Sequence, residues 1–164
     1  MRNLFLGIIL LVTFVLQSTF FNYIKIMGVK PDLLLVIVVI YALHNEEKSG
    51  GLFGFTAGLL QDIIIGKYIG LNSFTKGVIA FFVSHMEQKI YKENIIIPVM
   101  LVFTASIGHD GLYYLIRSLV DFNISLTTAF LGIILPSAVY NSLLVTIIYP
   151  KLHHSFTRGL LSRY

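Results

Sequence analysis

The chain has 164 residues, of which 56% are hydrophobic and 12% are charged, whereas a soluble domain has roughly 25% charged residues. A single soluble core of this length could not cover so much apolar surface, so the composition excludes an ordinary soluble domain. The net charge of +4 comes from 12 Lys and Arg scattered singly or in pairs between apolar runs, and this lack of a basic face argues against nucleic acid as a partner.

Apolar segments follow one another along the whole chain. The hydrocarbon core of a bilayer is ~30 Å thick and needs about 20 apolar residues as a helix. The sequence therefore predicts an all-α integral membrane protein, a single domain over residues 1–164 with six transmembrane helices at residues 4–21, 31–43, 50–65, 73–90, 95–120 and 127–149. The second and third segments are short, but the polar residues 44–49 between them do not suit lipid, which favours two separate spans over one re-entrant pair.

The beginning of the chain resembles a signal peptide, because a charged Arg2 precedes an apolar run. No small-x-small cleavage pattern follows Gln17, since Phe20 and Phe21 stand where small residues would be needed. We therefore expect the first segment to remain as an uncleaved span. The second segment opens with Pro31 and Asp32, residues that suit the first turn and the positive end of a helix dipole.

The third segment carries a stripe of small residues. Gly50, Gly54, Gly58 and Asp62 recur every four residues, which places them on one slowly winding face of a helix. Small residues let two helix backbones approach closely in a membrane. The stripe predicts close packing of a second helix, either from this chain or from a partner protein.

Asp62 ends this stripe. A carboxylate near the hydrocarbon costs roughly 2.5–3.5 kcal/mol on insertion scales and usually faces protein or water. We expect it to be hydrogen-bonded to the loop of residues 66–70, or paired with Lys67 or Lys76. A proton or ion relay is the alternative.

Three further polar residues fall inside the fourth and fifth segments: Lys76, His109 and Asp110. Neighbouring residues on a helix point about 100° apart, so His109 and Asp110 are not expected to share a proton or a metal ion by themselves. A buried polar cluster that links Asp110 to Lys76, or to another span, is the preferred interpretation. No zinc-hydrolase, nucleophile-elbow or phosphate-loop motif is present, so the sequence predicts no enzyme, no catalytic residue, no metal and no cofactor.

The sixth segment contains Pro136, which is expected to kink it. His153 and His154 follow in a basic tail that suits the membrane surface better than a metal site.

The basic residues predict an orientation. If the spans alternate, one side receives seven cations and the other receives four, with Lys76 left uncounted inside a span. The positive-inside rule then places both termini in the cytoplasm. The two sets are Arg2, Lys48, Lys89, Lys92, Lys151, Arg158 and Arg163 against Lys25, Lys30, Lys67 and Arg117.

Two blocks of sequence resemble the MreD family of rod shape-determining proteins. The first is the run from Pro31 to Leu35, and the second contains Gly54 and Phe55, the run from Gly58 through Gln61 to Asp62, and the run from Gly70 to Lys76. The resemblance is specific over roughly residues 31–77. The length, the six spans and the cytoplasmic termini agree with it.

This resemblance implies a scaffold without a reaction of its own in the cell-elongation machinery of the bacterial cytoplasmic membrane. Expected partners are membrane lipid, the single-span protein MreC, the actin-like MreB, the polymerase RodA and a class B penicillin-binding transpeptidase. On this hypothesis the face of Gly54 and Gly58 binds a partner helix, and Asp62 sets the depth of that contact.

The resemblance also implies a fold similar to the six-helix substrate-binding components of vitamin importers. The alternative function is therefore a component that holds a small molecule near the outer face of the membrane. Tyr113, Tyr114, Arg117 and Asn123, near the outer end of the fifth segment, are the best residues for such a site.

Overall fold

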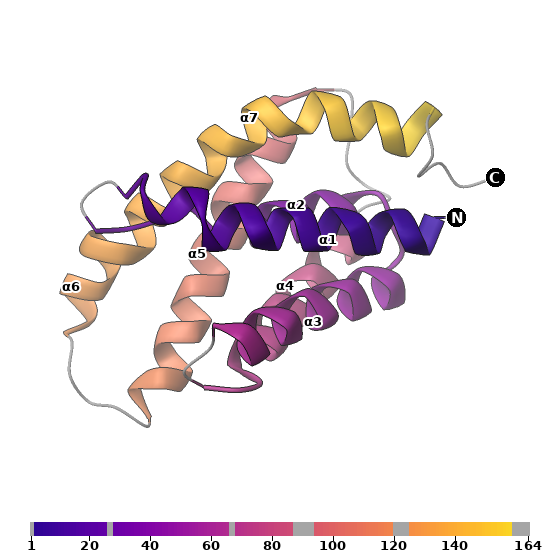
Figure 1. The fold of residues 1–164 in the computed structure, drawn as a ribbon. Coiled ribbons are helices and arrows are strands. Elements are labelled where there is room, and N and C mark those ends of the chain that lie inside the picture. The colour runs from indigo at the N-terminus through magenta and orange to yellow at the C-terminus, as the bar shows by residue number, and fades with distance from the viewer. Residues whose placement is uncertain (1, 26–27, 66–67, 87–93, 120–124, 159–164) are drawn as a thin grey trace.

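The computed structural model describes residues 2–25, 28–65, 68–86, 94–119 and 125–158, and these residues form an all-helical bundle (Figure 1). The bundle has six helical segments in chain order, the last of which is divided in three. The elements are α1 (Arg2–Ser18), η1 (Phe20–Asn22), α2 (Leu33–Leu43), α3 (Glu47–Ile64), α4 (Leu71–His85), α5 (Ile96–Ser118), α6 (Leu126–Ala129), η3 (Phe130–Ile134) and α7 (Leu135–Arg158).

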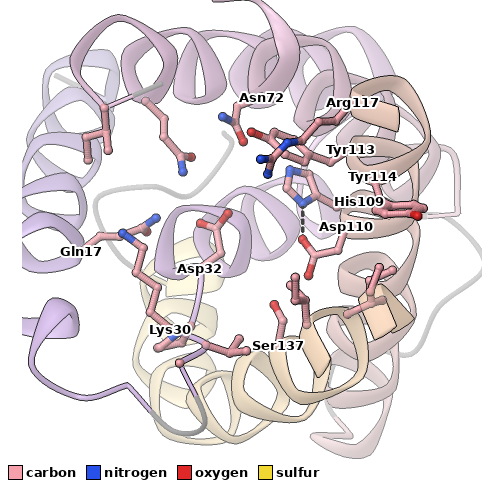
Figure 2. Close-up of a pocket in the computed structure, with 18 of the residues that line it drawn as sticks. Gln17, Lys30, Asp32, Asn72, His109, Asp110, Tyr113, Tyr114, Arg117 and Ser137 are labelled. Carbon is pink, nitrogen blue, oxygen red and sulfur yellow. Dashed lines mark hydrogen bonds and ion pairs between the residues drawn. The ribbon is translucent and has the colours of Figure 1, made fainter. Parts of the chain in front are cut away.

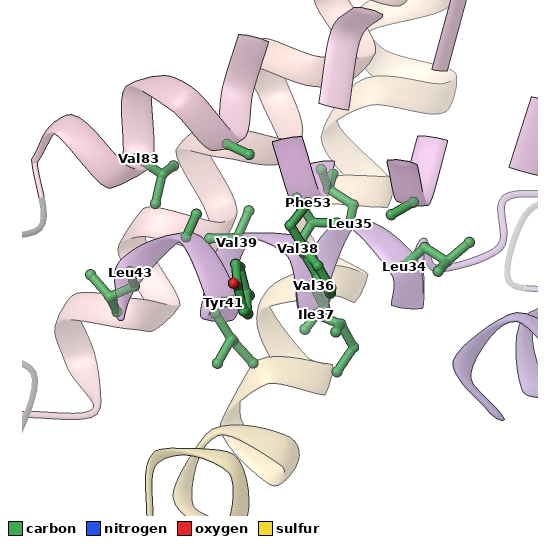
Figure 3. Packing of buried hydrophobic residues seen from close by; sticks show 14 of the residues in the cluster. Leu34, Leu35, Val36, Ile37, Val38, Val39, Tyr41, Leu43, Phe53 and Val83 are labelled. Atoms are coloured by element: carbon green, nitrogen blue, oxygen red, sulfur yellow. The ribbon is translucent and has the colours of Figure 1, made fainter. Parts of the chain in front are cut away.

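α2 lies at the centre of the bundle. All of its 11 residues are buried, and its side chains reach neighbours on α3, α4 and α7 (Figure 3). At 1.5 Å per residue, 11 residues span only about 16 Å, well short of the ~30 Å hydrocarbon core. A helix this short is held in place because its neighbours α3, α4, α5 and α7 pack around its sides.

α3 and α4 form the most closely packed helix pair. An ideal Cβ on Gly54 would lie 2.5 Å from the carbonyl oxygen of Lys76, and one on Gly58 would lie 2.3 Å from the carbonyl oxygen of Asn72. A Cβ on Gly50 would lie 1.9 Å from Ser84 Oγ. The glycine stripe therefore has α4 of the same chain against it, and that face is closed to a partner helix.

The sixth segment runs from α6 through η3 into α7 without a break. η3 is a π-helical turn that ends two residues before Pro136. Because proline has no N–H to donate to the residue four positions earlier, the local widening occurs where Pro136 was expected to kink the helix.

Two helices are long and apolar enough to cross a membrane, residues 96–118 and residues 126–156. α2 and residues 4–18 of α1 are apolar but shorter. All six predicted segments are thus helical in the structure. By length and composition, two of these helices qualify as candidate membrane spans. The fourth helix ends at His85, before the predicted end at residue 90, and residues 87–90 lie outside the described part of the chain.

The beginning of α1 and the end of α7 lie at the same end of the bundle (Figure 1). Because successive helices alternate in direction, the ends of α1, α3 and α5 and the beginnings of α2, α4 and α6 gather at the opposite end. The polar residues discussed next lie there.

Candidate functional site

The short central helix leaves room at one end of the bundle. The C-terminal end of α2 is level with the last turn of α4, since Ser84 Oγ donates to the carbonyl oxygen of Ala42 at 2.9 Å. α2 is therefore shorter than its neighbours at its N-terminal end. Asn141 bonds both the N–H of Asp32 at the start of α2 and the hydroxyl of Ser106 on α5, and α5 continues for 12 residues beyond Ser106, about 18 Å.

A pocket of about 890 Å³ occupies this space. Its wall is formed by the last turns of α1, α3 and α5, the first turn of α4, residues 28–32, and the region around η3 (Figure 2). The side chains that Figure 2 labels around it are all polar or charged: Gln17, Lys30, Asp32, Asn72, His109, Asp110, Tyr113, Tyr114, Arg117 and Ser137.

Asp32 lies at the base of the pocket as the N-cap of α2. Its carboxylate accepts the backbone N–H of Leu35 at 3.0 Å, and its own N–H donates to Asn141 Oδ1 at 2.8 Å. The second carboxylate oxygen forms an ion pair with Lys76 Nζ on α4. The side chain of Lys76 is 0% exposed, whereas that of Asp32 is 16% exposed on the pocket side. The lysine is therefore enclosed, and its counterion reaches the pocket.

One face of α5 forms the longest wall. His109, Tyr113 and Arg117 follow one another at four-residue intervals, which places them on one side of the helix. His109 Nδ1 lies 2.8 Å from Asp110 Oδ1, and because a carboxylate is an acceptor, the imidazole donates there.

This hydrogen bond corrects the expectation that His109 and Asp110 do not share a proton by themselves. Their Cα–Cβ bonds point apart, but the short side chain of Asp110 turns toward the ring nitrogen nearest the backbone. The expected link between Asp110 and Lys76 is wrong, because Lys76 forms its ion pair with Asp32.

Two buried polar atoms of residues that line the pocket have no hydrogen-bond partner among the described residues: His109 Nε2 and Gln61 Oε1. His109 is only 3% exposed. Buried polar groups are nearly always hydrogen-bonded, and leaving one unsatisfied costs about 1–3 kcal/mol. The wall of the pocket thus retains hydrogen-bonding capacity that the described chain does not use.

Asp62 connects the end of α3 to the beginning of α4 and is 1% exposed. Five donors reach its two carboxylate oxygens. They are the backbone N–H groups of Gly70, Asn72 and Ser73, the side-chain amide of Asn72 and the hydroxyl of Ser73, at 2.8–3.3 Å. Asp62 therefore closes the α3–α4 turn and satisfies the first N–H groups of α4.

We expect Asp62→Asn to lower the free energy of unfolding by about 2–3 kcal/mol. Asparagine replaces one acceptor oxygen with an NH₂ donor, which would face N–H and O–H groups that also donate. The thermal midpoint of the purified chain measures this loss. Glu47→Gln is the matched control, because Glu47 is exposed and contacts only His85 in the described part of the chain. Equal midpoints for both variants would contradict the role given to Asp62.

The other predicted residues lie elsewhere. Phe55 is 46% exposed on α3. Lys67, residue 66 of the expected Asp62 loop, and Asn123 lie outside the described residues. At the opposite end of the bundle, His153 Nδ1 lies 2.9 Å from His44 Nε2, so His153 packs on α2.

Sequence reasoning missed two residues that hold the base of the pocket, Gln17 and Asn141. It placed Asp32 correctly at the start of the second helix, but did not predict its ion pair with Lys76. Gln17 Oε1 accepts the N–H of Leu34 at 2.8 Å, and Asn141 is held by Ser106 at 2.9 Å. A signal was present, since Gln17 and Asn141 are single amides inside apolar segments. Such residues usually face protein in a membrane helix.

The side chains that line the pocket determine which ligand chemistry it suits. In the described parts of the chain, no three His, Asp or Glu side chains are grouped as they would be to hold a metal ion. The carboxylates of Asp32 and Asp110 are each engaged within the protein. The pocket can therefore contact a ligand through hydrogen bonds and aromatic surface.

Comparison with known proteins gives one family. The family model described as rod shape-determining protein MreD matches residues 1–157, almost the whole chain. No curated protein and no solved structure matches the chain.

Proposed function

The chain belongs to the MreD family, whose role is in rod shape determination, and on this premise we propose that it is a scaffold of the bacterial cell-elongation machinery. It links cytoplasmic filaments to peptidoglycan synthesis through helix–helix contacts. MreC is its first partner, and MreB, RodA and a class B penicillin-binding transpeptidase belong to the same assembly. The observation that carries this proposal is the family match over residues 1–157.

On this proposal the chain is a multi-pass protein of the cytoplasmic membrane. The chain passes through the bilayer six times, with the short α2 packed among the other helices, and both termini are cytoplasmic. The bias of seven basic residues against four supports this orientation. The pocket then opens toward the outer side of the membrane, since it lies at the end of the bundle opposite the start of α1.

The partner surface must be sought away from the glycine stripe, which α4 covers. Every long helix carries large apolar side chains that the rest of the chain leaves exposed, among them Leu11 on α1, Leu52 on α3, Phe82 on α4, Met100 on α5 and Leu143 on α7. In a membrane such faces contact lipid or another protein.

Site-specific photo-crosslinking tests the proposal. A photoreactive amino acid is placed, one at a time, at Leu11, Leu52, Phe82, Met100 and Leu143, and products are identified by mass spectrometry after irradiation of cells. We expect crosslinks to MreC from one helix or two neighbouring helices only. Val38 on α2 is the matched control, since it is fully buried and should crosslink within the chain.

Two results would count against the scaffold. Absence of any crosslink to an elongation protein, from variants that still support rod shape, would remove helix–helix contact as its means of action. Crosslinks to an ATPase and a coupling membrane subunit would support the importer alternative instead.

A further inference from the structure

The pocket beside α5 has walls whose hydrogen-bonding groups are not all used. His109 Nε2 and Gln61 Oε1 have no partner in the described chain, although both atoms are buried. With its Nδ1–H donated to Asp110, the ring of His109 still has Nε2 without a partner, and the amide oxygen of Gln61 is a second unused group. Both atoms therefore have an unused hydrogen bond.

The charges around the pocket argue against an ionic occupant. Lys30 and Arg117 stand in the same lining as Asp32 and Asp110, so the pocket gathers no cluster of charge of a single sign. A zwitterion would need a carboxylate for its ammonium group, but Asp32 is paired with Lys76 and Asp110 with His109. An uncharged group with hydroxyls meets these conditions, because a hydroxyl both donates and accepts.

We propose that this pocket binds an uncharged, hydroxyl-rich group such as a sugar. The group is supplied either as a free saccharide or as the head group of a glycolipid. This proposal goes beyond the scaffold function and does not depend on it, because it rests on the pocket alone.

The shape of the pocket fits such a ligand. Its volume of about 890 Å³ lies within the range of about 300–1,000 Å³ for sites that enclose small molecules. Tyr113 supplies aromatic surface together with a hydroxyl group (Figure 2). The π-helical turn η3 forms part of the wall through Ile133 and Ile134, and such turns are frequent at functional sites.

Thermal unfolding in a sugar-free detergent tests the proposal. Alkyl glycoside detergents must be avoided, because their head groups belong to the proposed ligand class. The full-length tagged chain is heated and the folded fraction is measured by size-exclusion chromatography. The probes are free maltose and methyl glucoside, then glucosyl diacylglycerol in mixed micelles. Phosphatidylglycerol with the same acyl chains controls for the lipid tails, and free serine serves as a zwitterionic probe.

Variants at His109 separate its two ring nitrogens. Asparagine carries an NH₂ group near the position of Nδ1 and has no atom at Nε2, so His109→Asn keeps a donor for Asp110 and removes the unpaired polar atom. Glutamine places its amide group near the position of Nε2, so His109→Gln retains a polar atom there. His85→Asn is the matched control at the other end of the bundle, where His85 contacts Glu47.

We expect a sugar probe to raise the unfolding midpoint by several degrees, because a ligand that binds only the folded state stabilises it. His109→Asn should weaken the apparent affinity about tenfold, the effect of losing one hydrogen bond. His109→Gln should recover most of it, and His85→Asn should leave it unchanged. A shift with free sugars identifies a soluble saccharide, and a shift with the glycolipid alone identifies a lipid head group.

Three results would overturn the proposal. The first is no shift with any sugar probe up to its solubility limit. The second is an equal shift with phosphatidylglycerol or with serine. The third is a shift that His109→Asn does not reduce. None of these results would bear on the crosslinking experiment, so the failure of one proposal remains distinguishable from the failure of the other.

Discussion

Replacing Gly58 with alanine is expected to lower the free energy of unfolding by about 3 kcal/mol or more and to deplete the chain from the membrane. The new Cβ would lie 2.3 Å from the carbonyl oxygen of Asn72 and 2.6 Å from the Cα of Ser73. Both atoms belong to the backbone, so a change of side-chain rotamer cannot relieve the overlap. α4 would have to move away from α3.

This movement would also break the closure of the α3–α4 turn. Asn72 and Ser73 donate four of the five hydrogen bonds that Asp62 accepts. The methyl group at Gly58 therefore disturbs both the helix contact and the cap. The thermal midpoint and the amount of folded chain in membranes measure the combined loss.

Gly7→Ala is the matched control for Gly58→Ala. Gly7 also lies in a helix, but an ideal Cβ there has no atom within 4 Å. Alanine favours helix by about 0.8–1.0 kcal/mol over glycine, so Gly7→Ala should be neutral or slightly stabilising. If Gly58→Ala proved as stable as Gly7→Ala, the close approach of α3 and α4 would be wrong.

The glycine stripe shows how far sequence reasoning extends. Its four-residue spacing predicted a closely packed helix face, because the spacing is a local property of an α-helix. The identity of the second helix is a tertiary property, and the spacing left it open between α4 and a partner. A loss of partner binding in a Gly58 variant would therefore report unfolding of the α3–α4 pair, not loss of a docking surface.

The polar residues show the same contrast between contacts that are local in sequence, which could be predicted, and tertiary contacts, which could not. Asp62 stands close in sequence to the turn that it caps, and hydrogen bonding to the following loop was among the expectations for it. The donors from Gly70 and Ser73 belong to that turn and to the beginning of α4. Lys76, in contrast, was expected beside Asp62 or Asp110, whereas its partner Asp32 lies 44 residues away in the chain.

The pocket could be predicted only in part. Tyr113, Tyr114 and Arg117 were recognised as aromatic and polar residues near one end of the fifth segment, and all three line the pocket. The pocket is deep because α2 has only 11 residues, and its N-terminal end stops short of the ends of the neighbouring helices. The sequence showed that the second segment is short, but a short segment alone does not show that other helices enclose it on all sides.

The second large effect is expected at the ion pair between Lys76 and Asp32. Asp32→Asn should lower the free energy of unfolding by about 3–5 kcal/mol, because it leaves the enclosed ammonium group of Lys76 without its counterion. Asparagine caps a helix as well as aspartate does, so the hydrogen bond to Leu35 remains and the variant tests the charge. Lys76→Met should cost less, since the carboxylate of Asp32 is 16% exposed toward the pocket.

A double variant separates the ion pair from the two side chains themselves. Asp32→Asn with Lys76→Met leaves no buried charge at this position, and replacing a buried ion pair with uncharged residues is often neutral or stabilising. The double variant should therefore unfold at a higher temperature than Asp32→Asn alone, which reverses the order that additive effects would give. Additive losses would mean that Lys76 and Asp32 act independently. A higher unfolding temperature for the double variant would show that Asp32 on α2 and Lys76 on α4 neutralise each other at the base of the pocket. Removing one charge is then costly because the other is left buried without a counterion.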